Sequence, residues 1–154
     1  MTSSEAAGGG MQGLLAAFGR QVGLDDLAFG EDGHCVLAID GVIVNLECDE
    51  RRGLLLIYAA LGMPDGDLAA VHAALLHANY LGIETNGMTL ALRPQDNMLV
   101  MSRWLDTRPL DLQDFEAALQ AFVDTAEAWT ARLPGLGAGV AAASGSPAPG
   151  ALRA

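Results

Sequence analysis

The stretch HCVLAIDGVIVNLEC, residues 34–48, decides the fold of this chain. Its centre, Asp40-Gly41, is a dipeptide favoured in the two-residue type I′ turn of a β-hairpin, because both turn positions need a positive φ. Apolar and β-branched residues flank this dipeptide on both sides. The sequence therefore predicts two antiparallel strands joined directly by the turn.

A two-residue turn also fixes which residues lie opposite each other across the hairpin. One side is predicted to be wholly apolar and pairs Ile39 with Val42, Leu37 with Val44 and Cys35 with Leu46. The other side is mixed and pairs Ala38 with Ile43, Val36 with Asn45 and His34 with Glu47. Because Cys35 and Cys48 are not opposed in this register, we expect two free thiols that pack as small apolar residues.

The segments after this hairpin predict three more strands. LLLIYAAL, residues 54–61, is apolar at nearly every position, as is typical of a central strand that is covered on both faces. MTLALRPQDNMLVMSRW, residues 88–104, alternates apolar and polar side chains on either side of a PQDN turn. This alternation predicts a second hairpin.

Two amphipathic helices are predicted at the ends of the folded region. Residues 11–22 carry an apolar stripe spaced three or four residues apart, and Gly23 follows as a C-terminal stop. LQDFEAALQAFVDTAEAWTARL, residues 112–133, carries a longer apolar stripe, and Asp111 is placed to cap its first turn.

The helix predicted over residues 67–81 has a different composition. It begins at an aspartate cap, Asp65 or Asp67, and consists almost entirely of alanine and leucine. A helix that is apolar most of the way round is expected to be buried on more than one side. We therefore expect this helix to take part in a subunit interface.

The order of elements is helix, three strands, helix, two strands, helix. Strands that arrive as hairpins predict an α+β fold with an antiparallel five-stranded sheet and three helices. The predicted domain spans residues 11–132. The glycine- and alanine-rich ends, residues 1–10 and 133–154, bury too little apolar surface to offset their ordering entropy and are expected to be disordered.

Composition excludes several classes of partner. The formal net charge is −11 at pH 7 with only eight basic residues, so nucleic acid and anionic membranes would be repelled. No apolar run reaches the roughly 18 to 20 residues that a membrane span needs. The first ten residues lack the basic and apolar regions of a secretory signal. We expect a cytoplasmic protein that neither binds nucleic acid nor inserts into membranes.

The sequence offers no anchor for catalysis, a metal or a cofactor. His72 and His77 are five residues apart on one predicted helix, so they cannot share a face as metal ligands do. The chain has no lysine, no G-x-S-x-G motif and no G-x-G-x-x-G motif after a predicted strand, and its paired acidic residues fall in predicted turns. We expect no enzyme activity; a small enzyme stays an alternative that needs His77 and a carboxylate to converge in a pocket.

An excess of apolar residues points instead to an interaction surface. Val36, Ala38 and Ile43 lie on the second side of the first hairpin. Either Leu55 and Ile57 or Leu54 and Leu56 of the next strand join them there. Another helix covers this surface in one reading; in the other it is an exposed groove that binds a protein.

The segments taken in order resemble the class I type III secretion chaperones, the Tir chaperone family. The resemblance rests on LLAAFGRQVGLDDLAF, GHCVLAIDGVIVNLEC, LLLIYAALG, LLHANYLG, GMTLALRPQDNMLVMSRW and PLDLQDFEAALQAFVDTAEAW. It covers about residues 11 to 132. The long alanine- and glycine-rich tail and the absence of lysine depart from it, and the role of residues 134–154 stays open.

This resemblance implies a bacterial, non-catalytic homodimer. Such a dimer binds the N-terminal segment of a secreted effector in extended form, through added strands and apolar grooves, and keeps it soluble and competent for secretion. The expected partners are a second copy, the effector and the secretion ATPase. A regulatory chaperone that binds another chaperone or a transcriptional regulator is the alternative function.

The resemblance also assigns roles by position. The dimer interface is expected to contain Leu68, Val71, Leu75, Leu76, Leu90 and Leu92. The effector-binding grooves are expected to contain Leu14, Leu15, Phe18, Val36, Ile43, Leu55 and Ile57. On this assignment Ile57→Glu should abolish capture of an effector and leave the dimer intact.

Overall fold

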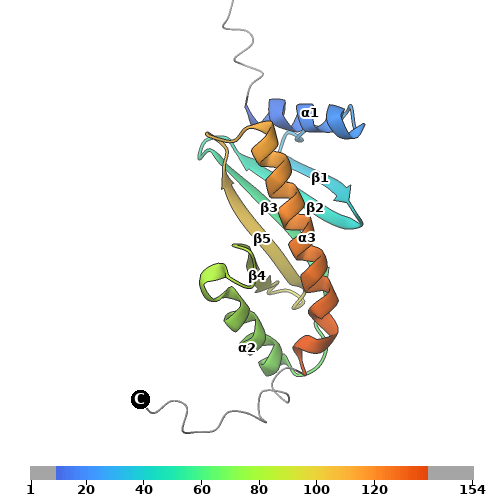
Figure 1. The fold of residues 1–154 in the computed structure, drawn as a ribbon, viewed down its shortest axis with the longest axis vertical. Helices are drawn as coiled ribbons and strands as arrows, with labels where there is room; N and C mark the ends of the chain where they lie inside the picture. Colours follow the sequence, from blue (N-terminus) through green and yellow to red (C-terminus); the bar gives the residue numbers. More distant parts are fainter. Residues whose placement is uncertain (1–9, 139–154) are drawn as a thin grey trace, which may run out of the picture.

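The computed structural model describes residues 10–138 and has the predicted order of elements (Figure 1). The elements are α1 (Met11–Val22), β1 (His34–Ile39), β2 (Val42–Asp49), β3 (Leu54–Gly62), α2 (Leu68–Asn79), the short 3-10 helix η2 (Tyr80–Gly82), β4 (Thr89–Leu92), β5 (Leu99–Asp106) and α3 (Leu112–Leu136). Together they form the α+β fold expected from the sequence.

The first hairpin forms with the predicted turn and register. Asp40 and Gly41 have φ angles of 49° and 84°, as a type I′ turn requires. All six predicted pairs between β1 and β2 are present, from Ile39 with Val42 to His34 with Glu47. The turn dipeptide alone was therefore enough to place every side chain of this hairpin.

The five strands form one antiparallel sheet in the order β1-β2-β3-β5-β4. A register shift between Ala60 and Gly62 marks an irregularity near the end of β3. Strands β1 and β4 are the two edges of the sheet. Their free backbone groups therefore decide where another strand could be added.

The core lies on one face of the sheet only. Figure 1 shows α3 crossing this face, with α1 near one end of α3 and α2 beside β4 at the other. The largest buried side chains include Trp129, Phe115 and Phe122 of α3, and Phe18 of α1 meets Phe115 edge to face at 5.6 Å between ring centroids.

Strand β3 shows the one-sided cover directly. Leu55, Ile57, Ala59 and Leu61 are buried, whereas Leu54, Leu56 and Tyr58 are half-buried and Ala60 is exposed. The prediction that both faces of this strand are covered is therefore wrong for the described chain. All three helices pack on the same face, and no described element lies on the other.

Helix α2 also buries a single side. Ala70, Val71, Leu75 and Ala78 face the core, while Leu76 is 71% exposed. The composition of α2 predicted burial on more than one side. Within one chain, only one side of the helix is buried. Of the two candidate caps, Asp67 is the one used, since its carboxylate accepts the N–H of Ala70 at 3.0 Å.

Helix α3 extends beyond residue 132, the predicted end of the folded domain. It ends at Leu136 with Leu133 and Leu136 buried, although Pro134 lies inside it. Gly137 then forms an isolated bridge with Gly66, just before α2. The predicted tail therefore begins later than residue 133. The disorder predicted for the two ends falls mostly on residues 1–9 and 139–154, which lie outside the described residues.

This bridge gives a matched pair of substitutions. A Cβ at Gly137 would overlap the carbonyl oxygen of Asp65 and the Cα of Gly66, whereas a Cβ at Gly135 meets nothing within 4 Å. We expect Gly137→Ala to lower the free energy of unfolding by about 1–3 kcal/mol, and Gly135→Ala to raise it by about 0.5–1 kcal/mol. Urea denaturation measures both changes; equal effects of the two substitutions would rule out a tight contact at residue 137.

Candidate functional site

The face of the sheet turned away from the helices, called here the outer face, is largely apolar. Its apolar residues are Val36, Ala38, Ile43, Leu54, Leu56, Tyr58, Ala60, Ala91, Val100 and Trp104. Val36, Ile43 and Trp104 are 51%, 56% and 55% exposed. Exposed apolar surface of this kind is typical of a site of interaction. Of the two interpretations of this surface, the described residues favour the exposed one.

Polar side chains cross the middle of the outer face. The Nε2 of His34 lies 3.1 Å from the Oδ1 of Asn45, and the hydroxyl of Tyr58 donates to Glu47 at 3.0 Å. Burial, and then the hydrogen bond to Glu47 and its charge, raise the pKa of Tyr58, so this hydroxyl stays a donor near neutral pH. These groups give the outer face fixed hydrogen-bonding positions between two apolar areas.

The residues predicted to bind an effector are divided between the outer face and the core. Val36 and Ile43 are on the outer face, whereas Leu55 and Ile57 are fully buried under α3. The positions on β3 are therefore corrected to the other pair considered, Leu54 and Leu56. The predicted α1 residues also point inward: Leu15 and Phe18 are buried and Leu14 is half-buried.

Strand β1 offers an open edge beside this face. In a hairpin with a two-residue turn, the backbone groups of every second residue point away from the partner strand, here those of His34, Val36 and Ala38. The N–H of His34 donates to Asp32 at 3.1 Å, and its C=O accepts from Gly30 at 2.9 Å. Among residues 10–138, nothing bonds to the outward N–H and C=O of Val36 and Ala38.

A pocket runs along the same part of β1. It has a volume of about 650 Å³ and lies between β1 and the segment that follows α1. Its lining residues are Gly23, Leu24, Asp25, Asp26, Leu27, Val36, Leu37 and Ala38. The open backbone groups and a cavity for side chains are thus found together, which is the arrangement that an added strand requires.

A second candidate surface lies between α2 and β4. A pocket of about 310 Å³ is lined by His72, Leu75, Leu76, Asn79, Leu90, Ala91 and Leu92. Of the residues predicted at a dimer interface, Leu76 and Leu68 are exposed and Leu92 is half-buried; Val71, Leu75 and Leu90 are in the chain's own core. Residues 68–83 contain no Asp, Glu, Lys or Arg, so this surface is free of formal charge apart from histidine.

The segment after α2 adds exposed apolar residues that sequence reasoning missed. Tyr80, Leu81 and Ile83 are 69%, 75% and 75% exposed. Leu81 has a φ of 55°, a conformation that leucine rarely adopts. The available signal was the lack of any charged residue between Asp67 and Glu84. The uncharged surface of α2 therefore continues past the end of the helix.

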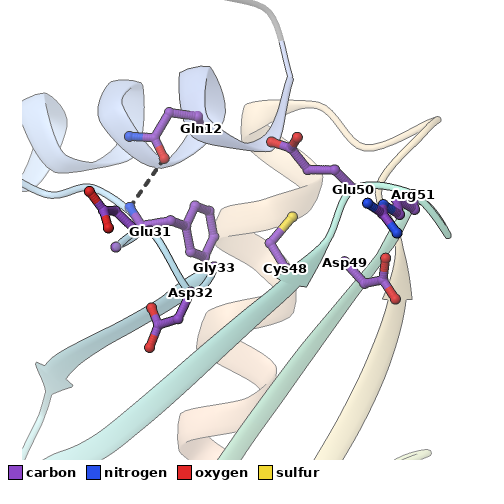
Figure 2. Close-up of a pocket in the computed structure, with 10 residues that line it drawn as sticks. Gln12, Glu31, Asp32, Gly33, Cys48, Asp49, Glu50 and Arg51 are labelled. Carbon is purple, nitrogen blue, oxygen red and sulfur yellow. Dashed lines mark hydrogen bonds between the residues drawn. The ribbon is translucent and has the colours of Figure 1, made fainter.

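A third pocket, of about 480 Å³, lies near the start of α1 and is lined by acidic residues (Figure 2). The Oε1 of Gln12 accepts the N–H of Phe29 at 3.1 Å and ties the loop to the helix. Asp49 accepts the N–H of Arg52 at 3.1 Å, as turn aspartates do. Asp32 likewise accepts the N–H of His34, so the two aspartates of this pocket bond to nearby backbone N–H groups in its turns.

The thiol in this pocket, Cys48, has a raised pKa. Cys35 and Cys48 are both free, and burial raises the pKa of each thiol. The charges of Glu50 and Asp49 raise the pKa of Cys48 further, so both thiols stay protonated at neutral pH. Within residues 10–138, no cluster of three or more His, Cys, Asp or Glu side chains could hold a metal ion.

Comparison with known proteins decides the family. Residues 13–130 match the model of the Tir chaperone protein (CesT) family. This chain belongs to that family. A Chlamydia pneumoniae protein is 27% identical to it over 130 residues, which are 82% of this chain and 98% of that protein.

Solved structures share the fold of this CesT-family chain. A chain of the ExsC–ExsE complex superposes with a TM-score of 0.71 and 25% identity, covering 86% of this chain and 96% of that one. The Yersinia pestis type III secretion chaperone SycH, solved with a fragment of YscM2, superposes with a TM-score of 0.60 and 22% identity, covering 76% of this chain and 97% of that one.

Family membership places this CesT-family chain among chaperones, and the described residues offer nothing that favours an enzyme. His72 and His77 are exposed on α2, and no described carboxylate is hydrogen-bonded to either. Among the described helices, none combines the length and the apolar character needed to cross a membrane.

Proposed function

We propose that this protein is a non-catalytic chaperone of the bacterial cytoplasm that binds an extended N-terminal segment of a type III effector. It keeps that segment soluble and competent for secretion. The observation that carries the proposal is the open edge of β1, which lies between a pocket and the uncovered outer face. Membership of the CesT family supports the same function.

The proposed binding mode follows from the chemistry of β1. Val36 and Ala38 each present one N–H and one C=O, and an incoming strand can pair with all of them. Side chains of that strand alternate between its two faces, so one set reaches the pocket beside α1 and the other extends the outer face. Backbone pairing then supplies affinity for many sequences, and the pocket supplies selectivity.

We also propose a homodimer that forms through the surface between α2 and β4. Two copies of a chain with a formal charge of −11 repel each other wherever their acidic residues meet. Residues 68–83 carry no Asp or Glu, which makes their surface the one that a second copy can approach. Leu68, Leu76 and Leu92 are the proposed contacts, and Val71, Leu75 and Leu90 support them from the core.

The dimer proposal predicts a change in mass on substitution of Leu76. We expect the wild-type protein to have about twice its chain mass of 15.9 kDa in solution. Leu76→Asp should produce folded monomers, because a carboxylate would be buried without a partner in the interface. Light scattering after gel filtration measures the mass. Ala128→Asp, at an exposed position of α3, is the matched control and should stay dimeric. A wild-type monomer would contradict the proposal.

Capture of the partner tests the function itself. Tagged full-length protein is recovered from its own cytoplasm, and the proteins bound to it are identified by mass spectrometry. We expect enrichment of a secreted effector bound through its N-terminal segment, and contact with the secretion ATPase is a further expected result. The capture is done both from cells with secretion on and from cells with secretion off. Capture of a transcriptional regulator or another chaperone would favour the regulatory alternative. A monomeric protein that captures no other protein would overturn both the effector-binding function and the regulatory alternative.

A further inference from the structure

The other edge of the sheet, β4, is closed by side chains of the same chain. The side-chain amide of Asn79 donates to the C=O of Leu90 at 2.8 Å and accepts the N–H of Leu90 at 2.9 Å. Asn79 is the last residue of α2, and the packing of Val71 and Leu75 against the core holds its end of the helix beside β4. One side chain thus occupies both outward backbone groups of Leu90.

The outward residue just before β4, Met88, is closed in the same way. The hydroxyl of Thr85, a fully buried side chain, donates to the C=O of Met88 at 2.6 Å. The C=O of Thr85 accepts the N–H of Met88 at 3.0 Å. The backbone groups of Met88 are therefore also engaged before any other strand arrives.

These bonds leave little of β4 open to another strand. The N–H of Arg93 donates to Met98 across the hairpin at 2.8 Å, so the residues whose backbone groups point outward are Met88, just before β4, and Leu90 and Leu92 within it. Among the described residues, only Leu92 keeps outward groups without a partner. A single open residue next to a turn cannot hold a strand in register, whereas β1 offers two open residues and a pocket.

We propose that Asn79 is a specificity-determining residue that closes the β4 edge and so restricts strand addition to β1. A side-chain amide carries one donor and one acceptor in the arrangement of a peptide group, so it takes the place of one residue of an incoming strand. A strand that paired with Leu90 would have to break the two hydrogen bonds from Asn79 before it could form two hydrogen bonds of its own. The restriction of strand addition to β1 rests on the proposed function. The closure of β4 against a second copy of this chain does not depend on that function.

Substitution of Asn79 tests the closure in the protein alone, without any partner. In full-length Asn79→Ala we expect hydrogen exchange at the Leu90 amide to be at least about tenfold faster in dilute solution, because its acceptor is lost. We also expect the sedimentation mass to rise with protein concentration beyond that of the wild type, because an unprotected edge pairs with another copy. If the alanine variant is poorly folded, the same two measurements are made on Asn79→Ser, and the same results are expected.

Two further variants separate closure of the edge from a general loss of structure. Asn79→Ala/Thr89→Lys restores none of the lost bonds, but a charge on the exposed edge strand, outside the pocket between α2 and β4, should return the mass to the wild-type value. His77→Ala, at an exposed neighbour on α2, should match the wild type in both measurements. The proposal is overturned if Asn79→Ala and Asn79→Ser keep the wild-type mass at every concentration, or if the lysine does not reverse their association. Both results are independent of whether the wild type captures an effector.

Discussion

Ile57→Lys is expected to unfold the protein, whereas Leu56→Lys is expected to leave it folded. The two residues are neighbours on β3, but Ile57 is 0% exposed beneath α3 and Leu56 is half-buried on the outer face. An ammonium group at residue 57 would lie in the core without a partner, at a cost of several kcal/mol against a total stability of about 5–15 kcal/mol. At residue 56 it would lie opposite Glu47, which gives the new charge a partner.

Circular dichroism during heating measures both variants. We expect no cooperative transition for Ile57→Lys and a midpoint within a few degrees of the wild type for Leu56→Lys. Similar midpoints for the two variants would mean that the faces of β3 are assigned incorrectly. This result also bears on the expectation that Ile57→Glu abolishes capture specifically: at a core position any loss of capture would follow from unfolding. Leu56→Lys is the proper test of the outer face.

Ala38→Pro is expected to abolish partner capture while the protein stays folded. Ala38 lies opposite Ile43 in a pair whose backbone groups point outward, so its N–H takes no part in the hairpin. Proline removes this donor, and its ring fills the space that an incoming strand needs; at an edge strand this is tolerated. We expect affinity for the captured segment to fall by at least about tenfold, the equivalent of one lost hydrogen bond plus a steric clash.

The matched control for this variant is Ala38→Val. It adds a larger side chain at the same position but keeps the N–H, and valine favours strands. Titration of the captured segment into each variant, together with thermal midpoints, gives the comparison. We expect Ala38→Val to keep most of the affinity that Ala38→Pro loses, because it keeps the N–H. Equal binding by the proline and valine variants would show that the partner does not pair with β1.

The first hairpin could be predicted completely from the sequence, and β3 could not. Asp40-Gly41 allows one turn type, and that turn sets every pair between β1 and β2. Residues 54–61 are apolar on both faces, so alternation cannot tell which set faces the core. The choice is made by the pairing of β3 with β2 and by α3 packing on one face only, and both are tertiary effects.

Two features depended on contacts between distant segments. Asn79, at the end of α2, bonds to Leu90, eleven residues later on another element. No local pattern encodes that contact. Helix α3 was expected to end before Pro134, yet it continues because Leu133 and Leu136 reach the core and Gly137 meets Gly66. The missing N–H of proline removes one helical hydrogen bond only, which this packing offsets.

Hydrogen exchange on the protein with its captured partner tests most directly the claim that an extended segment pairs with β1. The amides of Val36, Ala38 and Leu90 are followed with and without the partner recovered from the cytoplasm. We predict that exchange at Val36 and Ala38 slows by at least about tenfold in the complex, because both amides gain acceptors, while exchange at Leu90, already bonded to Asn79, changes little. Unchanged exchange at Val36 and Ala38 in a complex that is demonstrably formed would contradict the account.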